Sequence, residues 1–401
     1  MKEHKVVVPS REEYIELATS LAKFDRRTEI VSLKESVGRV TAKDIYALHT
    51  LPNQPTSAMD GIAVRFEAFT SKEVDPTAWE LGKEYVFSNT GVAIPTEYDT
   101  AIPIEHVKFD NNNRLHINKI PSCRGENVVP RGKNMKEGEL LVPAEYVITP
   151  LQLGVLASGG ICEIEVIAKP KVAIIPTGNE LVPAGAVLPL GKNIETNSIV
   201  LEALIKEWGG EPIVYPIIPD DPVYIYDILY HALKQSDMVI FNGGSSKGTH
   251  DFGKEILGKI GQVYAYEVAH GPGKHTSLTV AGNKLIVGLV GPPGGTELTA
   301  PWYVKPLINK YLCKPDVQAP KLEVKLLNEI SSSAPFDFYI QLIVSQQDGE
   351  YVATRIKMFN ATRAQLAVQA NAILCVPRGV VFKKGETVAV ELKIPIEYIS
   401  A

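Results

Sequence analysis

The clearest hydrophobic pattern lies between residues 171 and 316, where short apolar runs alternate with amphipathic segments. Four runs have the length and continuity of buried strands: residues 172–175, 213–218, 238–241 and 285–289. Three amphipathic segments begin with residues that favour helix starts, at Asn197, at Asp221-Pro222 and at Thr296, the last expected to run as one helix to Tyr311. Strands that alternate with helices predict a doubly wound, mostly parallel α/β domain, which binds ligands at the carboxyl ends of its strands.

The patterns before residue 171 predict two helices that flank a β-rich insertion. Ser10-Arg11-Glu12-Glu13 has the form of a capping box at the start of an amphipathic helix, and Thr149-Pro150 opens a second helix. We expect these two helices to pack together. The segment between them contains short alternating runs typical of strands, at residues 85–87, 100–104 and 115–117.

The last part of the chain is again β-rich. Alternating runs at residues 338–344, 351–356 and 388–392 predict strands, and Asp348-Gly349 is a hairpin turn between the first two. A small antiparallel barrel or sandwich is expected. The domain boundaries that follow are 1–44 with 139–170 for a discontinuous helical domain, 45–138 for the β-rich insertion, 171–316 for the α/β domain, and 317–401 for the C-terminal β domain.

The 401 residues have the composition of a folded globular protein, with 45% apolar and 22% charged residues and a net charge of -5. This charge disfavours nucleic acid as a partner, because proteins that bind it usually carry a dominant basic face. We expect no membrane partner and a cytoplasmic location, because the chain shows no signal peptide and no apolar stretch of about 18 residues. The four cysteines are far apart and are expected to be reduced, buried thiols.

Glycine-rich turns follow two of the predicted strands, and a third lies between them. They are Gly243-Gly244 with Ser246, Lys247 and Gly248; Gly271-Pro272-Gly273-Lys274; and Gly291 to Gly295. Such turns present backbone N–H groups to anions, and Lys247 and Lys274 are placed to reach a phosphate. We therefore expect the three loops to converge on one phosphate-bearing ligand. The chain has no Walker A, G-x-G-x-x-G or G-x-S-x-G motif, which disfavours P-loop, dinucleotide-binding and serine hydrolase functions.

Acidic residues fall at or just after the carboxyl ends of the predicted strands: Glu180, Asp220, Asp221 and Asp251. Carboxylates beside phosphate-binding loops predict a Mg²⁺ site, because this ion prefers oxygen ligands and bridges protein to phosphate. The simpler alternatives are helix caps for Asp221 and Asp251 and a solvated loop charge for Glu180.

Two further features have local explanations of their own. His250, His270 and His275 do not have the spacing of helical zinc ligands, which favours phosphate contact or plain loop surface. Asp60 presents a carboxylate beside Gly61 in a turn, and a simple Asx turn at a strand start is the alternative to a functional role.

The chain resembles the MoeA family of molybdopterin molybdenumtransferases, which includes the gephyrin E domain. The resemblance covers nearly the whole chain and is carried by these motifs, in order: Ser57-Ala58-Met59-Asp60-Gly61, Asn89-Thr90-Gly91, Pro176-Thr177-Gly178-Asn179-Glu180, Asp220-Asp221-Pro222, Asn242-Gly243-Gly244 with Ser246, Gly248 and Asp251, and Pro272-Gly273-Lys274. It implies four domains, with the helical one elongated and split by the β insertion, and a homodimer. The active crevice would lie between the α/β domain of one subunit and the β insertion of the other.

The resemblance also implies the reaction and its residues. Molybdate is inserted into adenylylated molybdopterin, with Mg²⁺-dependent release of AMP. The implied catalytic residues are Asp60, Thr90, Glu180, Asp220 and Asp251, of which Glu180, Asp220 and Asp251 are also the metal residues. The cofactor-binding residues would be Gly243, Gly244, Ser246, Lys247, Gly248, Pro272, Gly273, Lys274, Gly291 and Pro293. A molybdopterin adenylyltransferase or a molybdoenzyme is an implied protein partner.

The chain departs from the family pattern at several positions. Val290 and Pro292 replace a proline and an asparagine of the usual Gly-Leu-Pro-Gly-Asn-Pro loop, which is here Gly288 to Pro293. Asn134 and Asn179 stand where aspartates are common, Gly271 where a lysine is common, and the stretch Arg363 to Asn371 lacks the usual serines.

Three functions are therefore compatible with the sequence. The first is an active molybdenum insertase. The second is a non-catalytic paralogue that binds molybdopterin or the molybdenum cofactor as a carrier or as the partner of a molybdoenzyme. The third is a nucleotide pyrophosphatase with the same type of fold.

Overall fold

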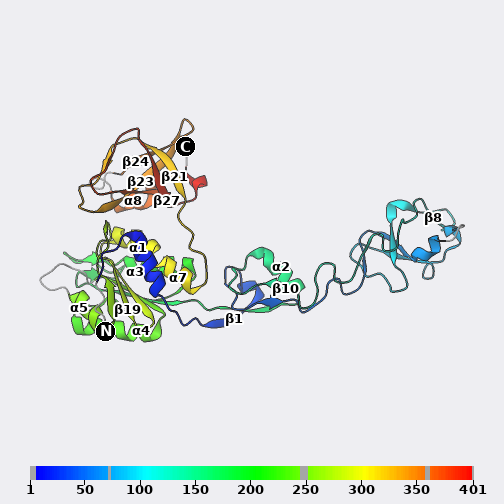
Figure 1. The fold of residues 1–401 in the computed structure, drawn as a ribbon, viewed down its shortest axis with the longest axis horizontal. Coiled ribbons are helices and arrows are strands. Elements are labelled where there is room, and N and C mark those ends of the chain that lie inside the picture. Colours follow the sequence, from blue (N-terminus) through cyan, green and yellow to red (C-terminus); the bar gives the residue numbers. More distant parts are fainter. Residues whose placement is uncertain (1–5, 71–73, 244–251, 357–361, 400–401) are drawn as a thin grey trace. The chain divides into compact units, whose positions relative to one another are not determined.

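The computed structural model describes residues 6–70, 74–243, 252–356 and 362–399. The chain divides into two compact units, one made of Met1–Arg27 with Ala168–Ala401 and the other of Thr28–Ile167 (Figure 1). No helix among the described residues has both the length and the apolar character needed to cross a membrane.

The centre of the first unit is a six-stranded sheet with the strand order β15-β12-β16-β20-β19-β17. The first four strands are parallel, and the last two are antiparallel to their neighbours. The strands are β12 (Lys171–Pro176), β15 (Glu211–Val214), β16 (Met238–Asn242), β17 (Gln262–Ala265), β19 (Ser277–Ala281) and β20 (Lys284–Leu289), and a small parallel pair, β13 (Leu181–Val182) and β14 (Asn193–Ile194), lies beside it in sequence.

Helices cover both faces of this sheet, as the alternating pattern predicted. Helices α4 (Pro222–Gln235) and α5 (Phe252–Ile260) bury Ile225, Leu229 and Ile256 against strand residues of one face. Helix α3 (Asn197–Trp208) packs on the opposite face, together with α6 (Pro293–Tyr303) and α7 (Lys305–Tyr311) (Figure 1). The doubly wound, mostly parallel fold is thereby confirmed.

Two predicted elements end earlier than expected, each at a proline. The single helix predicted over residues 296–311 is wrong, because α6 and α7 are separate and the break falls at Val304, two residues before Pro306. The strand predicted over 213–218 ends at Val214, two residues before Pro216. Pro306 lies in the first turn of α7, where its missing N–H costs no helical hydrogen bond, and Pro216 has no N–H with which to extend the ladder of β15.

Helix α1 (Arg11–Leu21) belongs to the α/β unit. Its predicted capping box is confirmed, with Ser10 and Glu13 each bonded to the backbone N–H of the other. The fully buried Tyr14 lies 4.2 Å from Tyr303, ring centre to ring centre, and donates a 2.9 Å hydrogen bond to the Ser277 carbonyl. The expectation that α1 packs against the second predicted helix is therefore wrong, because that helix lies in the other unit.

The second unit contains the second predicted helix, α2 (Pro150–Ser158), and the β-rich insertion. Ile45, Val142, Ile148 and Leu156 form one core with β1 and β11, and the insertion has cores of its own around Ile62 and Ala63. The strands are β1 (Thr28–Ser32), β2 (Ile45–Tyr46), β3 (Thr56–Ser57), β4 (Gly61–Val64), β5 (Tyr85–Ser88), β6 (Thr100–Pro103), β7 (Val107–Phe109), β8 (Leu115–Ile117), β9 (Val128–Val129), β10 (Leu140–Val142) and β11 (Glu163–Ile167). All three strands predicted for the insertion are present.

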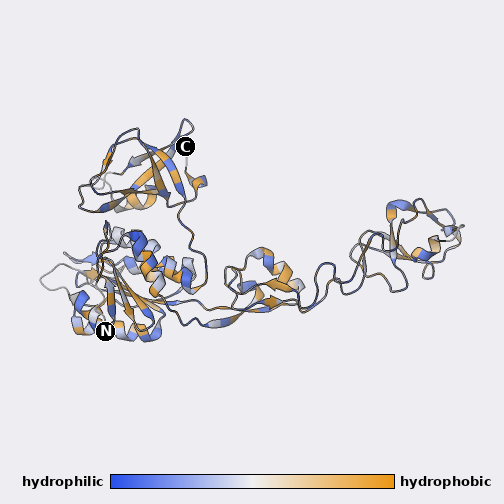
Figure 2. Cartoon of the chain, viewed as in Figure 1, coloured by the Kyte–Doolittle hydropathy of each residue, from blue (hydrophilic) through white to orange (hydrophobic). Residues whose placement is uncertain are grey.

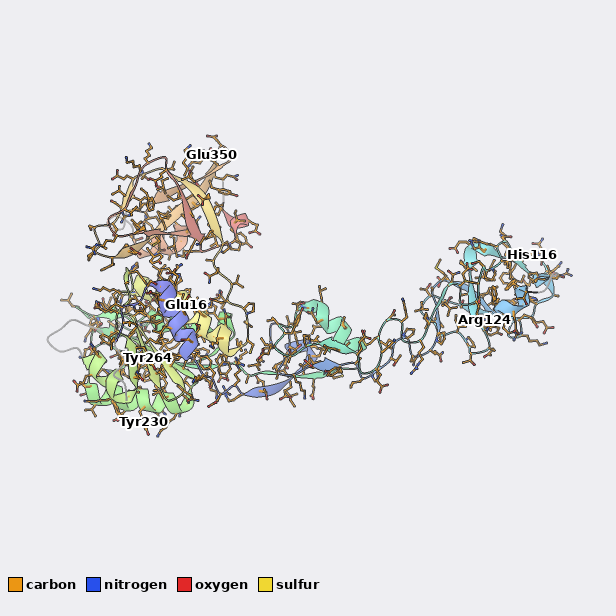
Figure 3. All side chains as sticks on the ribbon, in the orientation of Figure 1. Glu16, His116, Arg124, Tyr230, Tyr264 and Glu350 are labelled. Carbon is orange, nitrogen blue, oxygen red and sulfur yellow. The ribbon has the colours of Figure 1, made fainter. Side chains whose placement is uncertain are left out.

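Polar residues of the insertion form local ion pairs at its surface. His116 and Arg124, both labelled in Figure 3, lie 3.4 Å from Asp110 Oδ2 and 3.1 Å from Asp99 Oδ2, respectively. Exposed pairs of this kind contribute little to stability.

The C-terminal strands close into a five-stranded barrel, one of the two predicted alternatives, but the barrel is not wholly antiparallel as expected, because β21 and β24 pair in parallel. The pairing runs β23-β24-β21-β27-β25 and returns from β25 to β23. Figure 2 shows apolar residues along these strands, which form the barrel core. Its elements are β21 (Lys321–Leu326), β22 (Ile330–Ser331), β23 (Asp337–Gln347), β24 (Glu350–Arg355), α8 (Arg363–Gln369), β25 (Ala372–Val376), β26 (Val381–Phe382) and β27 (Thr387–Leu392). The predicted hairpin joins β23 to β24, with positive φ at both Asp348 and Gly349.

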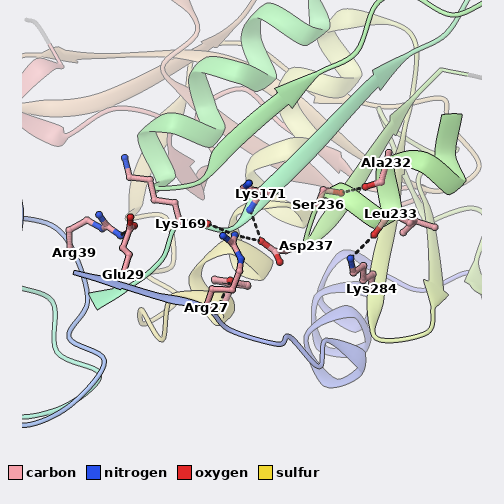
Figure 4. A network of polar contacts seen from close by, with 11 residues as sticks. Arg27, Glu29, Arg39, Lys169, Lys171, Ala232, Leu233, Ser236, Asp237 and Lys284 are labelled. Atoms are coloured by element: carbon pink, nitrogen blue, oxygen red, sulfur yellow. Dashed lines mark hydrogen bonds and ion pairs between the residues drawn. The ribbon is translucent and has the colours of Figure 1, made fainter. Parts of the chain in front are cut away.

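The amino-terminal edge of the α/β sheet is fixed by one carboxylate (Figure 4). Asp237 Oδ2 accepts hydrogen bonds from the Lys171 N–H at 2.7 Å and from the Arg27 guanidinium at 3.0 Å. Lys284 donates from the neighbouring strand to the Leu233 carbonyl in the last turn of α4. These contacts fix the first residue of β12, just after the chain leaves the second unit.

The prediction that all four cysteines are buried is wrong. Cys123 and Cys162 are exposed, Cys313 and Cys375 are partly buried, and none of the four forms a disulfide. Wide spacing along the chain bears on disulfide formation and carries no information about burial.

Removal of the Tyr14 hydroxyl should destabilise the α/β unit, because the Ser277 carbonyl would stay buried without this donor. We expect Tyr14→Phe to lower the free energy of unfolding by about 1–2 kcal/mol. Tyr230→Phe, at an exposed tyrosine of α4, is the matched control and should change it by less than about 0.5 kcal/mol. Urea unfolding followed by circular dichroism measures both, and equal midpoints for the two variants would contradict the assigned role of this hydrogen bond.

Candidate functional site

The glycine turns after β12, β16 and β20 meet at the carboxyl edge of the sheet. Gly243 has φ of +103°, and a Cβ atom added to it would lie 2.5 Å from the Thr177 carbonyl oxygen. A Cβ atom added to Gly291 would lie 4.0 Å from the Gly243 Cα atom. The Gly243 contact leaves no room for a side chain, whereas the Gly291 distance is an ordinary van der Waals contact that places the two turns against each other.

The third glycine turn joins the same place. A Cβ atom on Gly273, whose φ is +95°, would lie 2.3 Å from Thr299 Cγ2 in α6. A Cβ atom on Gly295 would lie 3.7 Å from the Gly273 nitrogen. The structure therefore brings Gly243, Gly273 and the segment 291–295 together, as the sequence led us to expect.

A buried asparagine ties these turns to one another. The Asn242 amide nitrogen donates to the Val290 carbonyl at 2.8 Å and to Thr296 Oγ1 at 3.1 Å, and its oxygen accepts from the Asn197 amide at 2.9 Å. Asn197 also donates to the Gly291 carbonyl at 2.9 Å. The Asn197 amide oxygen is buried and has no hydrogen-bond partner in the structure.

Asn197 was missed as a site residue in the sequence analysis, where it was assigned only a helix-capping role. Thr196 occupies the N-cap position instead, and Asn197 is the first residue of α3. Its signal in the sequence is a polar residue at a helix start that follows a strand of a parallel sheet, which places its side chain beside the strand ends.

The segment that departs from the family pattern has a definite packing. Val290 is 7% exposed, and a Cβ atom on Gly295 would lie 2.5 Å from Val290 Cγ2. The Val290 carbonyl accepts from Thr296 Oγ1 and from Asn242. Pro293 occupies the first position of α6, where the lack of an N–H costs no helical hydrogen bond. Of the two changed residues, Val290 packs against this helix start and Pro292 is its N-cap.

The predicted carboxylates have different surroundings. Asp220 accepts hydrogen bonds from Thr177 Oγ1 at 2.9 Å and from the Asn179 N–H at 3.1 Å, which links the ends of β12 and β15. The Glu180 carboxylate lies over Gly178, 2.8 Å from the position of an added Cβ atom. Asp221 accepts from the Tyr224 N–H at 2.9 Å and caps α4, so the simpler alternative holds for that residue.

The described carboxylates have the oxygen chemistry that suits Mg²⁺. Thr177 and Asn179 each donate to a different Asp220 oxygen, and each oxygen keeps a second lone pair; Glu180 is exposed. Within the described ranges, no three His, Cys, Asp or Glu side chains form a cluster that could hold a metal ion. Asp251, the third metal residue that was predicted, lies outside the described residues, as do Gly244, Ser246, Lys247, Gly248 and His250.

Two lysines contribute positive charge at this edge. Lys274 Nζ lies 3.5 Å from Glu267 Oε2 and 5.3 Å from the centre of the Phe336 ring. Lys192, which the sequence analysis did not select, donates a 2.6 Å hydrogen bond to the Asn179 carbonyl. The sequence carried little sign of this, because Lys192 lies in an exposed loop and is many residues away, along the sequence, from the end of β12.

His270 lies inside the protein, so its assignment to loop surface or to phosphate contact is wrong. It is 2% exposed, its Nε2 atom is hydrogen-bonded to the Tyr303 hydroxyl, and its Nδ1 atom has no hydrogen-bond partner in the structure. Burial, together with the nearby Arg11 charge, lowers the pKa of His270 to about 4. His275 is more exposed and lies 3.3 Å from Glu267 Oε1.

The second unit holds the other two predicted catalytic residues side by side. Asp60 Oδ1 accepts hydrogen bonds from the Thr90 N–H at 2.6 Å and from the Thr90 hydroxyl at 3.0 Å. These bonds lower the pKa of Asp60 below its usual range. Because the bonded residue is 30 positions away, Asp60 is not part of a simple Asx turn. The structure thus presents an exposed, ionised carboxylate next to a threonine hydroxyl.

Three family models match the chain in sequence order. The MoeA N-terminal region (domain I and II) matches residues 9–160, a probable molybdopterin binding domain matches residues 173–310, and the MoeA C-terminal region (domain IV) matches residues 323–393.

Curated and solved relatives agree with these models. The chain is 32% identical to the molybdopterin molybdenumtransferase of Haemophilus influenzae over 72% of the chain and 74% of the relative. It is 30% identical to that of Bacillus subtilis over 91% of the chain and 90% of the relative. The crystal structure of a molybdopterin biosynthesis MoeA protein from Pyrococcus horikosii is similar, with a TM-score of 0.80 and 28% identity over 98% of this chain and 100% of that one.

The buried His270 should make stability depend on pH. The pKa of His270 falls from the ordinary 6.5 to about 4 on folding. Between pH 6.5 and pH 4, His270 is therefore protonated in the unfolded chain and neutral in the folded one. Stability is fully present above pH 6.5 and falls as the pH is lowered toward 4, by roughly 3 kcal/mol in total from this residue. The unfolding free energy of a His270→Gln variant should fall less steeply over this window.

Urea unfolding of both proteins at a series of pH values measures the difference in slope. His231→Gln, at an exposed histidine of α4, controls for the substitution itself. Parallel curves for the wild type and His270→Gln would rule out the linkage.

Proposed function

The chain belongs to the MoeA family of molybdopterin molybdenumtransferases, and we propose that it inserts molybdate into adenylylated molybdopterin with Mg²⁺-dependent release of AMP. The observation that carries this proposal is the convergence of three glycine turns at strand ends that also bear Glu180 and Asp220. Molybdate and the phosphoanhydride are both anions. An open backbone surface with lysines beside it suits both of them.

The residues of the α/β domain divide the work by their chemistry. Lys274 supplies a compact positive charge for the anions, and the glycine turns allow a close approach of the backbone. Asn197 offers an unpartnered buried amide oxygen, which can accept a hydrogen bond from an N–H group of a pterin ring. This polar atom is the kind of group that fixes the orientation of a flat heterocycle in a pocket.

Glu180, Asp220 and Asp251 would hold Mg²⁺. The ion would supply a positive charge that offsets negative charge on the phosphates as the anhydride is cleaved. Asp220 is well suited to this role, because Thr177 and Asn179 fix the orientation of its carboxylate. The Asn179 side chain adds to this arrangement, because its Oδ1 atom accepts a 3.2 Å hydrogen bond from the Asp220 N–H.

The site would be completed by a second subunit of a homodimer. Asp60 and Thr90 would reach the α/β domain of the partner, where the ionised Asp60 carboxylate is a hydrogen-bond acceptor and the Thr90 hydroxyl a donor or acceptor. The cytoplasm, with its reduced thiols, is the location that fits the free cysteines. A molybdopterin adenylyltransferase would supply the adenylylated substrate, and a molybdoenzyme would receive the product.

The adjacent aspartates 220 and 221 provide a matched test of this proposal. Asp220→Asn should lower the rate of molybdate- and Mg²⁺-dependent AMP release by about 10²–10³-fold, because it removes a charge that would hold the metal. Asp221→Asn keeps the cap of α4 and should retain nearly full activity. Release of AMP is followed by chromatography.

The same assay separates the two alternative functions. Tight binding of the adenylylated pterin by the wild type without AMP release would indicate a carrier. Hydrolysis of ordinary dinucleotides would indicate a pyrophosphatase.

A site shared between subunits predicts complementation. Asp60→Ala and Asp220→Asn proteins would each be inactive, but a heterodimer of the two contains one site with both residues intact. Random exchange of subunits should therefore restore about a quarter of the wild-type activity. No recovery after verified subunit exchange would contradict a site shared between subunits. It would mean either that Asp60 and Asp220 act in the site of the same subunit or that one of them has no part in the site.

A further inference from the structure

A short strand of the α/β domain is paired with the barrel. Strand β18 (His270–Gly271) lies parallel to the start of β23, with His270 opposite Asp337 and Gly271 opposite Phe338. The next three residues, Pro272, Gly273 and Lys274, form what we call the Pro-Gly-Lys loop. The backbone of this loop therefore continues directly from the edge of the barrel sheet into the candidate site.

Two aromatic rings of the barrel close over Gly271. A Cβ atom added there would lie 2.7 Å from Phe336 Cε2 and 2.9 Å from Phe338 Cε2, closer than real Cβ atoms approach. The backbone of Gly271 is not in the left-handed region, so the rings and not the chain conformation require a glycine. The missing side chain, where relatives often carry a lysine, is replaced here by packing against the barrel.

Phe336 also contacts the other end of the loop. The Lys274 ammonium lies 5.3 Å from the centre of its ring, within the range of a cation–π interaction, and 3.5 Å from Glu267 Oε2. The Val268 N–H donates to the Lys274 carbonyl at 2.8 Å and closes the loop at its base. The Phe336 ring therefore packs on Gly271, just before the loop, and also contacts the Lys274 ammonium at the end of the loop.

The barrel is itself anchored beside this ring. Arg11 of α1 forms two hydrogen bonds with Glu391 of β27, at 2.6 and 2.9 Å, and its guanidinium lies about 5 Å from the ring centres of both Trp302 and Tyr339. The His270 ring packs against Tyr339 at 5.2 Å. Because these contacts join α1, α6, β18 and the barrel, they fix the place from which Phe336 reaches the loop.

We propose that Phe336 is a positioning residue through which the barrel sets the conformation of the Pro-Gly-Lys loop and the location of the Lys274 charge. This inference deepens the proposed function, on which it rests for the identity of the anion, and gives the C-terminal domain a direct part in substrate affinity. Phe336 does not touch the reacting atoms. Its role is to hold Lys274 in a position from which the ammonium can bind an anionic substrate without reorganisation of the loop.

Hydrogen exchange of the full chain tests the structural part without any need for activity. Phe336→Leu removes the ring face, and amides of residues 268–276 should exchange about three- to tenfold faster. Phe336→Tyr keeps the ring and should restore wild-type exchange. Phe382→Leu removes a ring that packs against the barrel core and is the matched control. Equal exchange of this peptide in Phe336→Leu and Phe382→Leu would overturn the proposal.

A pair of variants at Gly271 guards against a general loss of folding. Gly271→Ala places a methyl group against the ring and should speed exchange of residues 268–276, while exchange of β12 stays unchanged. The same substitution in a Phe336→Ala background should have a smaller added effect, because the closest ring is gone. Independent, additive effects of the two substitutions would also overturn the proposal.

The kinetic readout separates positioning from a merely structural role. Phe336→Leu should raise KM for adenylylated molybdopterin about tenfold and change kcat by less than about twofold, since a binding contact is lost and the reacting groups are untouched. An unchanged KM alongside faster loop exchange would overturn the link to substrate. If the wild type releases no AMP, the proposed function fails, and the exchange data still decide whether Phe336 positions the loop.

Discussion

The candidate site depends on the close approach of bare backbone at the ends of four parallel strands. Strand ends in such a sheet are about 5 Å apart, and turns that follow them can meet only if few side chains intervene. Gly243 fits between Thr177 and Gly291 for this reason, and the buried Asn242 amide holds the arrangement by bonding to carbonyl groups of the next turn. A polar side chain in such a place is stable because its donors are satisfied, and it specifies one register of the loops.

Much of this architecture could be predicted from the sequence, because local patterns report it directly. The runs at residues 172–175, 238–241 and 285–289 are strands of one sheet, and the turn at Asp348-Gly349 joins two barrel strands. The meeting of the glycine turns followed from their positions after predicted strands, since carboxyl ends of parallel strands share one edge. For the strands and the hairpin, the signal and the structure lie in the same few residues.

The errors arose where the outcome depends on distant residues. The position of α1 is decided by contacts of Tyr14 with Ser277 and Tyr303, which no pattern near residue 14 reveals. His270 looked like a loop histidine because a Gly-Pro-Gly turn follows it, yet Trp302, Tyr303 and Tyr339 enclose its ring. The burial of the Asn197 amide oxygen without a hydrogen-bond partner likewise depends on residues that are distant in sequence, such as Gly291. The roles assigned to Glu180, Asp220 and Asp251, and the domain boundaries, stay predictions.

The division of the chain into two units has a consequence for how the protein is made. Residues 11–21 leave the ribosome before the second unit, but α6, α7 and β19, against which α1 packs, follow only after the whole of residues 28–167 has been synthesised. The second unit can therefore fold before the packing partners of α1 have been synthesised. During this time the apolar side of α1 is exposed to solvent and chaperones. Completion of the α/β core is postponed until α7, which ends at Tyr311, has been synthesised, so the nascent chain passes through a long stage in which only its inserted part is native.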